Sequence, residues 1–288
     1  MHFTQAKGIL SSSNGINPYR GCTHGCIYCD SRSDCYRTPK PFEDVEAKQN
    51  APELLERALS SRRKKCMIGF GAMSDPYLPL EKELRLTRGC LEAILRHGFG
   101  AAVLTKSDLI LRDRELLREI SRKSRCVVQM TLTAADDDLC RLIEPNVCTT
   151  SRRVHVLRAF REDGIETAVW LSPFLPFITD TQENLDALME LCVGARVSAV
   201  VCFGIGVTMR RGNREHFYAM LDRRFPGLRK KYEAEFGMRY ECASQNSGVL
   251  MERLAARCQE NGIIFGIDGP FRFLREFPQT EIQGELPF

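Results

Sequence analysis

Three cysteines with short, fixed separations are the residues of this sequence best suited to chemistry. Cys22, Cys26 and Cys29 follow a C-x3-C-x2-C spacing in a loop that also contains Gly21 and Gly25. Iron–sulfur clusters are bound through cysteine thiolates, so three thiolates in one loop suit three irons of a [4Fe–4S] cluster. No fourth cysteine follows closely, and one iron would remain open to a ligand that the protein does not supply.

A zinc site is the main alternative for the same residues. Structural zinc takes four Cys or His ligands, and His24 lies between two of the cysteines. Structural zinc patterns usually pair two short ligand clusters, however, and no second cluster follows here. The spacing therefore favours an iron–sulfur cluster over zinc or unliganded thiols.

The longer string around these cysteines resembles a known family. The motif with Tyr28 directly before the last cysteine is similar to that of the radical S-adenosylmethionine superfamily. The string Asn-Pro-Tyr-Arg-Gly-Cys-x-His-Gly-Cys-x-Tyr-Cys, residues 17–29, resembles the branch of spore photoproduct lyase. The resemblance implies that S-adenosylmethionine chelates the open iron and that its reductive cleavage yields a 5′-deoxyadenosyl radical. It also implies a small electron donor such as flavodoxin or ferredoxin.

Polar residues after the predicted strands are candidates for binding this cofactor. Ser74 and Asp75 follow the second strand in a Gly-Phe-Gly-Ala-Met-Ser-Asp-Pro segment, which resembles the family's glycine-rich motif for the methionine amino group. Lys106 ends the third strand and resembles the lysine that binds the methionine carboxylate. Thr131 and Thr133 end the fourth strand, where hydroxyl groups can reach the ribose or the carboxylate. The alternative explanations are a Ser-Asp-Pro turn for Ser74 and Asp75, a solvated lysine for Lys106 and ordinary strand propensity for the two threonines.

The sequence departs from the lyase at two positions. The lyase returns a hydrogen atom from a cysteine on the strand-two loop, and the matching residue here is Ala72. A tyrosine that assists the lyase directly after the third cluster cysteine is replaced by Asp30. Catalytic roles therefore fall to Tyr28 and to three candidate hydrogen donors: Cys35, Cys202 and Tyr77. Glu144 with Arg152 and Arg153 resembles a later family segment, but we interpret these charges as surface ion pairs.

The composition indicates a globular chain without a membrane span. Of the 288 residues, 43% are hydrophobic and 27% charged, and the net charge is +4. No apolar run approaches the roughly 18 residues that a transmembrane helix needs. Thirteen cysteines without a secretion signal predict a reducing, cytoplasmic environment.

Apolar runs alternate with amphipathic segments through most of the chain. We expect strands at 15–19, 66–70, 100–105, 126–132, 167–171 and 198–203, with helices at 52–63, 86–96, 112–122, 152–162 and 182–193. Residues 31–50 read as irregular surface. The alternation predicts a parallel sheet covered by helices, either a partial (β/α)6 TIM-like barrel, as the resemblance implies, or a doubly wound sheet.

Past residue 212 the sequence is more charged and predicts a C-terminal helical extension. Helices are expected at 214–225, 228–236 and 249–260. We expect 1–212 to form the core barrel and 213–288 an extension packed on it. The terminal residues 283–288 loosely resemble peptides that bind DNA sliding clamps.

Together these patterns predict a lyase-like radical S-adenosylmethionine enzyme that abstracts hydrogen from an unidentified substrate, with a nucleic-acid base as one candidate. The alternative is a non-enzymatic nucleic-acid-binding protein stabilised by zinc or a cluster. The basic segments 61–65 and 223–231 suit phosphate contacts in either case.

Overall fold

The centre of the molecule is a six-stranded parallel sheet. A computed structural model describes residues 1–37 and 40–278. The six strands follow the chain order β2-β5-β6-β7-β8-β9, and every neighbouring pair is parallel. Their bounds are β2 Gly15–Ile16, β5 Met67–Phe70, β6 Gly100–Thr105, β7 Cys126–Thr131, β8 Glu166–Trp170 and β9 Ala199–Val201.

This strand order separates the two folds that the sequence left open. A doubly wound sheet reverses its strand order at a switch point, whereas a barrel adds each strand beside the previous one. The uninterrupted order confirms the partial (β/α)6 TIM-like barrel.

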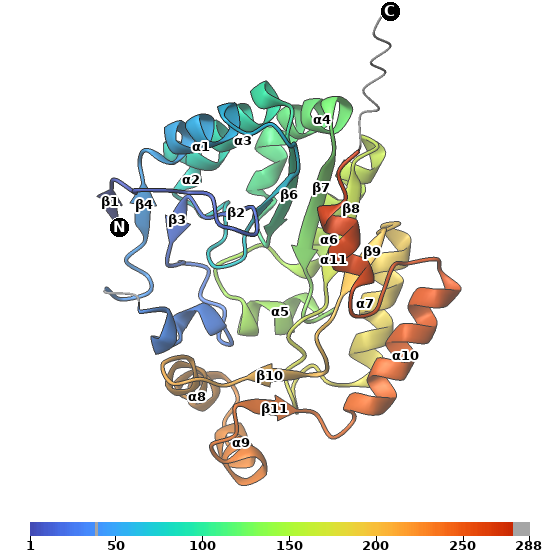
Figure 1. Ribbon diagram of the computed structural model, residues 1–288. Helices are drawn as coiled ribbons and strands as arrows, with labels where there is room; N and C mark the ends of the chain where they lie inside the picture. Colours follow the sequence, from blue (N-terminus) through green and yellow to red (C-terminus); the bar gives the residue numbers. More distant parts are fainter. Residues whose placement is uncertain (38–39, 279–288) are drawn as a thin grey trace, which may run out of the picture.

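Helices cover the outer face of the sheet, as Figure 1 shows. They alternate with the strands and bury a large apolar core against them. The covering helices are α1 Ala51–Ser60, α3 Leu86–His97, α4 Arg114–Lys123, α6 Thr150–Glu162 and α7 Gln182–Gly194, with the short α2 Glu81–Leu84 and α5 Asp137–Ile143 between them. The predicted strands and helices of the barrel are confirmed, with ends shifted by a few residues.

The inner face of the sheet is filled by a helix that the sequence analysis did not predict. Helix α11 (Gly269–Arg275) lies against β8 and β9 in Figure 1 and buries Phe273 and Leu274 on the inner strand residues. Several of these inner residues are alanines, including Ala102 and Ala168. Their small side chains leave room for a helix inside the half-barrel. Arg125 anchors it by donating hydrogen bonds to the carbonyl oxygens of Phe273 and Glu276.

A small sheet lies at the N-terminal side. Strand β4 (Glu46–Lys48) pairs with β1 (His2–Thr4) and with β3 (Tyr19–Arg20). Residues 31–50 are therefore not simply irregular surface, because Val45 and Ala47 are fully buried. The predicted strand at 15–19 is divided, since Gly15–Ile16 joins the large sheet and Tyr19–Arg20 the small one. Two 3-10 turns, η1 Asp30–Arg32 and η2 Asp34–Tyr36, follow the cysteine loop.

The C-terminal segment contributes a second small sheet and further helices. Strands β10 (Gly206–Thr208) and β11 (Glu241–Ala243) are antiparallel, and α8 (Asn213–Arg224) and α9 (Leu228–Phe236) lie between them in the chain. Helix α10 (Ser247–Glu260) contacts α7. The three helices predicted here are confirmed, while the division at residue 212 stays a prediction. The clamp-like residues 283–288 lie outside the described residues.

Candidate active site

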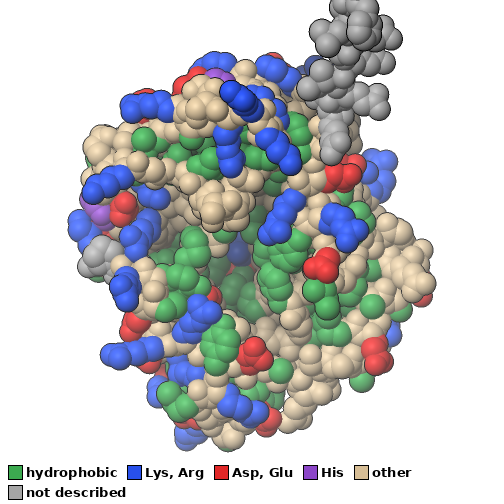
Figure 2. All heavy atoms as spheres, in the orientation of Figure 1, with side chains coloured by type: hydrophobic (Ala, Val, Ile, Leu, Met, Phe, Trp, Pro, Cys, Tyr) green, Lys and Arg blue, Asp and Glu red, His purple; other side chains and the backbone are tan. Residues whose placement is uncertain are grey.

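A cavity of about 640 Å³ opens at the carboxyl ends of the barrel strands. The cysteine loop, the segment after β5, the ends of β6, β7 and β8, and strands β10 and β11 all line it. Figure 2 shows this face hollowed near its centre, with hydrophobic side chains around the hollow. Loops at this end of a TIM-like barrel carry the reactive groups of barrel enzymes, so the cavity is the candidate active site.

The thiols of Cys22, Cys26 and Cys29 line this cavity and are not in disulfides. Within residues 1–37 and 40–278, no three His, Cys, Asp or Glu side chains are close enough together to hold a single metal ion. A [4Fe–4S] cluster instead takes each thiolate on a different iron. Three free thiols on one cavity wall therefore fit the donor set of such a cluster.

The end of α5 and the residues after it support the cysteine loop from behind. Ile27 donates its N–H to the carbonyl oxygen of Ile143 at 3.0 Å, and Asn146 donates its N–H to the carbonyl oxygen of His24 at 3.1 Å. Gly25 has a φ of 71°, and a Cβ there would lie 3.0 Å from the Asn146 side chain. The loop is therefore laid closely along residues 143–146.

Burial makes the thiol forms of two cysteines more stable. It raises the pKa of Cys22 to about 12, and it raises the pKa of Cys26 well above its usual value. The positive charge of Lys106 opposes the shift at Cys26. Because metal ligands must be deprotonated, binding of a cluster would release these protons.

Ser74 and Asp75 line the cavity, and both side chains are hydrogen-bonded within the protein. The Ser74 hydroxyl donates to the carbonyl oxygen of Gly21 at 2.6 Å, which links this segment to the cysteine loop. The Asp75 carboxylate accepts from the Thr105 hydroxyl at 2.7 Å and from the Lys106 N–H at 2.8 Å. These bonds fix the segment after β5 against the end of β6.

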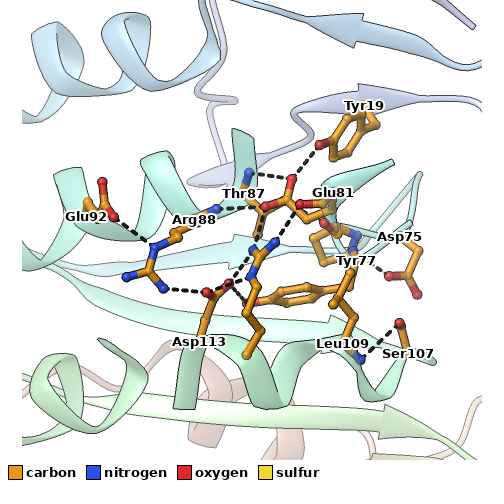
Figure 3. A network of polar contacts seen from close by, with 12 residues as sticks. Tyr19, Asp75, Tyr77, Glu81, Thr87, Arg88, Glu92, Ser107, Leu109 and Asp113 are labelled. Atoms are coloured by element: carbon orange, nitrogen blue, oxygen red, sulfur yellow. Dashed lines mark hydrogen bonds and ion pairs between the residues drawn. The ribbon is translucent and has the colours of Figure 1, made fainter. Parts of the chain in front are cut away.

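A buried polar network holds the same segment on its other side (Figure 3). Tyr77, which is fully buried, donates its hydroxyl to Asp113 at 3.1 Å. Thr87 donates its hydroxyl to the carbonyl oxygen of Pro76 at 2.6 Å. The Glu81 carboxylate accepts the N–H of Thr87 near the start of α3. Helix α3 is thereby joined to the cavity wall.

Lys106 lies in the cavity with its ammonium group above the ring of Tyr28, 5.9 Å from the ring centre. Among the described residues, its Nζ has no hydrogen-bond acceptor and no carboxylate oxygen within 4.0 Å. The nearby Glu144 is bound elsewhere: it accepts the Tyr28 hydroxyl and pairs with Arg153 at 2.6 Å. The geometry thus leaves a cation facing the cavity.

Glu144 and Arg153 correct the interpretation as surface ion pairs, because both side chains are 0% exposed. Only Arg152 behaves as expected, since it forms a half-exposed pair with Asp108. The sequence contained a signal: Arg153 shares one helical face of α6 with Leu157 and Phe160. That spacing places all three against the core.

The structure brings many of the predicted site residues to one cavity. Those that line it are Cys22, Cys26, Tyr28, Cys29, Ser74, Asp75, Lys106 and Thr131, together with Asp30 and Ala72 at the positions that differ from the lyase. Thr133 lies just behind, where its hydroxyl is 3.2 Å from the Tyr28 hydroxyl. The cofactor roles of these residues stay predictions.

The three candidate hydrogen donors do not line the cavity. Tyr77 is buried in the network described above, and Cys35 is exposed on η2, where its sulfur lies 3.4 Å from Arg210. The Cys202 sulfur faces the Gly204 carbonyl oxygen at 3.6 Å. Their positions do not support a direct role in chemistry inside the cavity.

A cluster of three aromatic side chains at the far wall of the cavity was not predicted from the sequence. Trp170 and Phe203 line the cavity, and Phe271 at the start of α11 packs on both, with ring centres 6.1 and 5.9 Å away. Phe203 remains 67% exposed. The spacing of these residues in the sequence gives no sign that they form a cluster, because only the folding of the barrel and the position of α11 bring them together.

Comparison with known proteins identifies the family. The model of the Radical SAM superfamily matches residues 16–192, which include the cysteine loop and most of the barrel. The chain belongs to the radical S-adenosylmethionine superfamily. Members of this family use a [4Fe–4S] cluster and S-adenosylmethionine, so these are the cofactors of this protein.

Individual proteins are similar over much of the chain. An uncharacterized protein of Mycobacterium tuberculosis is 32% identical over 248 residues, which cover 83% of this chain and 72% of the relative. The Radical SAM Nalpha-GlyT isomerase of Pseudomonas phage M6 is 24% identical over 65% of this chain and 38% of its own length. A spore photoproduct lyase mutant with bound AdoMet and dinucleoside spore photoproduct has the same fold, with a TM-score of 0.60, 13% identity and coverage of 87% and 74%.

Membership of an enzyme superfamily favours the enzyme over the non-enzymatic alternative. In the part of the chain that the structure describes, no helix is long and apolar enough to cross a membrane.

Proposed function

We propose that this protein is a radical S-adenosylmethionine enzyme in which Cys22, Cys26 and Cys29 hold the [4Fe–4S] cluster. The observation that carries the proposal is that these three thiols and the unpaired ammonium of Lys106 line one cavity. When bound and reduced, the cluster supplies the electron that cleaves S-adenosylmethionine to a 5′-deoxyadenosyl radical, which abstracts hydrogen from the substrate.

The residues around the cysteines divide into two groups. Lys106 and Thr131 present polar groups to the cavity, and we assign them to direct contact with the cofactor, with Lys106 on its carboxylate. Ser74, Asp75 and Thr133 already have protein partners, and we assign them to holding the cavity wall in place. The Tyr28 ring supports the Lys106 side chain.

The substrate is unidentified, and a nucleic-acid base is one candidate. It is supported by the fold shared with spore photoproduct lyase, which was solved with a dinucleoside spore photoproduct. Ala72 has no thiol and Asp30 has no phenol, so these two residues cannot return a hydrogen atom to the product as the lyase's cysteine and tyrosine do. A radical modification other than lysis of a thymine photoproduct therefore suits the cavity better.

Two partners complete the proposal. A flavodoxin or ferredoxin type of protein would reduce the cluster. Contact with a DNA sliding clamp through residues 283–288, which lie outside the described residues, stays a prediction from the sequence.

The test of the cluster assignment is anaerobic reconstitution with iron and sulfide. The protein should be brown and, once reduced, should convert S-adenosylmethionine to 5′-deoxyadenosine, whereas Cys26→Ala should lose both properties. Cys66→Ala is the matched control, because Cys66 precedes β5 at the opposite end of that strand from the cavity segment. Colour and cleavage that survive in Cys26→Ala would reject the ligand assignment, and zinc in place of iron and sulfide would reject the function.

The test of the substrate class uses deuterium transfer. Thymine-dimer DNA and undamaged DNA, each carrying deuterium on the thymine methyl groups, are incubated with the reduced enzyme. Label that enters 5′-deoxyadenosine, without restoration of thymines from the dimer, would support a base modification other than photoproduct lysis. Label that enters from neither DNA would exclude thymine methyl groups as the site of hydrogen abstraction.

A further inference from the structure

Tyr28 links Lys106 to the buried carboxylate of Glu144: the Lys106 ammonium lies 5.9 Å from the centre of the Tyr28 ring, and the Tyr28 hydroxyl donates to Glu144. Glu144 is 0% exposed. Against the effect of burial, Cys26 and then Glu144 raise the pKa of Lys106, and Arg153 and then Lys106 lower the pKa of Glu144. In a site of low dielectric, an ammonium beside an unpaired carboxylate would pair with it.

Arg153 occupies the Glu144 carboxylate instead. Its Nη1 lies 2.6 Å from Glu144 Oε2, and the other carboxylate oxygen accepts the hydroxyl of Tyr28. The Thr133 hydroxyl also donates to this oxygen at 3.4 Å. Both oxygens of Glu144 are therefore used without Lys106.

The guanidinium group is itself fixed in position. Arg153 Nη1 donates to the Thr131 carbonyl oxygen at 2.9 Å, and Nε donates to the Cys148 carbonyl oxygen at 2.9 Å. These contacts tie it to the end of β7 and to the residues before α6. A planar guanidinium with several fixed donors holds a carboxylate more firmly than an ammonium does.

We propose that Arg153 is a positioning residue that neutralises Glu144 and so keeps Lys106 free to bind the carboxylate of S-adenosylmethionine. The inference rests on the proposed function, because it takes Lys106 as the cofactor's anion-binding residue. Arg153 and Glu144 themselves are assigned no contact with the cofactor or the substrate. They form a buried pair of zero net charge, which leaves the Lys106 ammonium without a carboxylate partner.

The test compares equilibrium affinities of the reconstituted, unreduced enzyme for S-adenosylmethionine, measured by equilibrium dialysis. Lys106→Gln should weaken binding about tenfold, as expected for loss of a charge-assisted hydrogen bond. Arg153→Gln should weaken it by a similar factor, because Glu144 then captures Lys106. The double variant Glu144→Gln/Arg153→Gln should bind within about threefold of the wild type, and cluster absorbance should be retained in all three.

A double-mutant cycle of Lys106 and Arg153 tells whether Arg153 positions Lys106 or only stabilises the fold. In a Lys106→Gln background, adding Arg153→Gln should cause no further loss of affinity. A further tenfold loss would overturn the proposal, as would a double Glu144/Arg153 variant that binds as weakly as Arg153→Gln. Should Arg153→Gln fail to fold, Arg153→Lys replaces it in the same cycle, with a smaller expected loss that must again vanish without Lys106.

The two hypotheses fail in different ways. If Lys106→Gln binds S-adenosylmethionine as tightly as the wild type, the assignment of Lys106 in the proposed function is wrong. If Lys106→Gln weakens binding and Arg153→Gln does not, only the role of Arg153 is wrong.

Discussion

Replacement of Glu81 should destabilise the protein more than replacement of any exposed carboxylate near it. Glu81 is 0% exposed, and every interaction drawn to its carboxylate in Figure 3 comes from a hydrogen-bond donor. It accepts the hydroxyl of Tyr19, the N–H groups of Thr87 and Arg88 at 3.0 and 3.2 Å, and Arg112 Nη2 at 2.8 Å. One carboxylate thus caps the start of α3 and neutralises a guanidinium.

The magnitude follows from these two roles. Loss of a helix cap costs about 1 kcal/mol, and breaking one side of a buried ion pair costs about 3 to 5 kcal/mol. Arg112 keeps a second partner, Asp113, at 2.7 Å, which places the total near the lower end of that range. We expect Glu81→Ala to lower the free energy of unfolding by about 3 kcal/mol.

The assay is urea denaturation of the apoprotein at neutral pH under reducing conditions. With a slope of about 3 kcal/mol per molar urea, the midpoint should fall by about 1 M. Glu92→Gln is the matched control, because Glu92 pairs with Arg88 at 3.1 Å but is 45% exposed, and it should change the stability by less than about 0.5 kcal/mol. Equal effects of the two variants would refute the assignment of Glu81 as a buried cap and counter-ion.

Three further outcomes are expected from the same denaturation assay. Gly71→Ala should lower the free energy of unfolding by about 2 kcal/mol or more, because φ is +92° and the new Cβ would lie 2.1 Å from the Leu104 carbonyl oxygen. Gly69→Ala is the control, since no atom lies within 4 Å of its Cβ, and equal losses in the two variants would contradict the clash. Phe273→Ala should cost about 3 kcal/mol if α11 is part of the barrel core, whereas a loss under about 1 kcal/mol would mean that it packs only loosely. Burial, reinforced by Arg32, lowers the pKa of His216 from 6.5 to about 4, so between these pH values only the unfolded chain gains a proton at this residue. The free energy of unfolding should therefore fall as the pH drops from 6.5 towards 4. If it falls equally steeply in His216→Gln, other groups cause the decrease.

The elements of the barrel could be predicted because their sequence patterns are strong. The run Gly100–Thr105 is apolar throughout and forms β6 with the expected bounds, and α9 likewise matches its predicted range. The cysteine loop was equally clear, since thiols at this spacing have few structural uses. Local pattern and tertiary fold agree at these places.

Other features depend on contacts that no local pattern carries. Strands β10 and β11 have three residues each, too few to show a periodic pattern, and residues 209–240 separate them in the chain. The position of α11 inside the half-barrel follows from small residues on several separate strands. Glu144 and Arg153 were misjudged because charged residues are usually exposed, while here each provides the partner that makes burial of the other possible.

Trp170 is the one tryptophan in the sequence, and it lies on the wall of the cavity, edge-on to Phe203. The indole emission of the whole chain therefore arises at the site where cofactor and substrate are expected to meet. An iron–sulfur cluster absorbs broadly and would quench this emission by energy transfer. Binding of the cluster, and subsequent binding of a ligand beside Phe203, can thus be followed by tryptophan fluorescence in the unmodified protein.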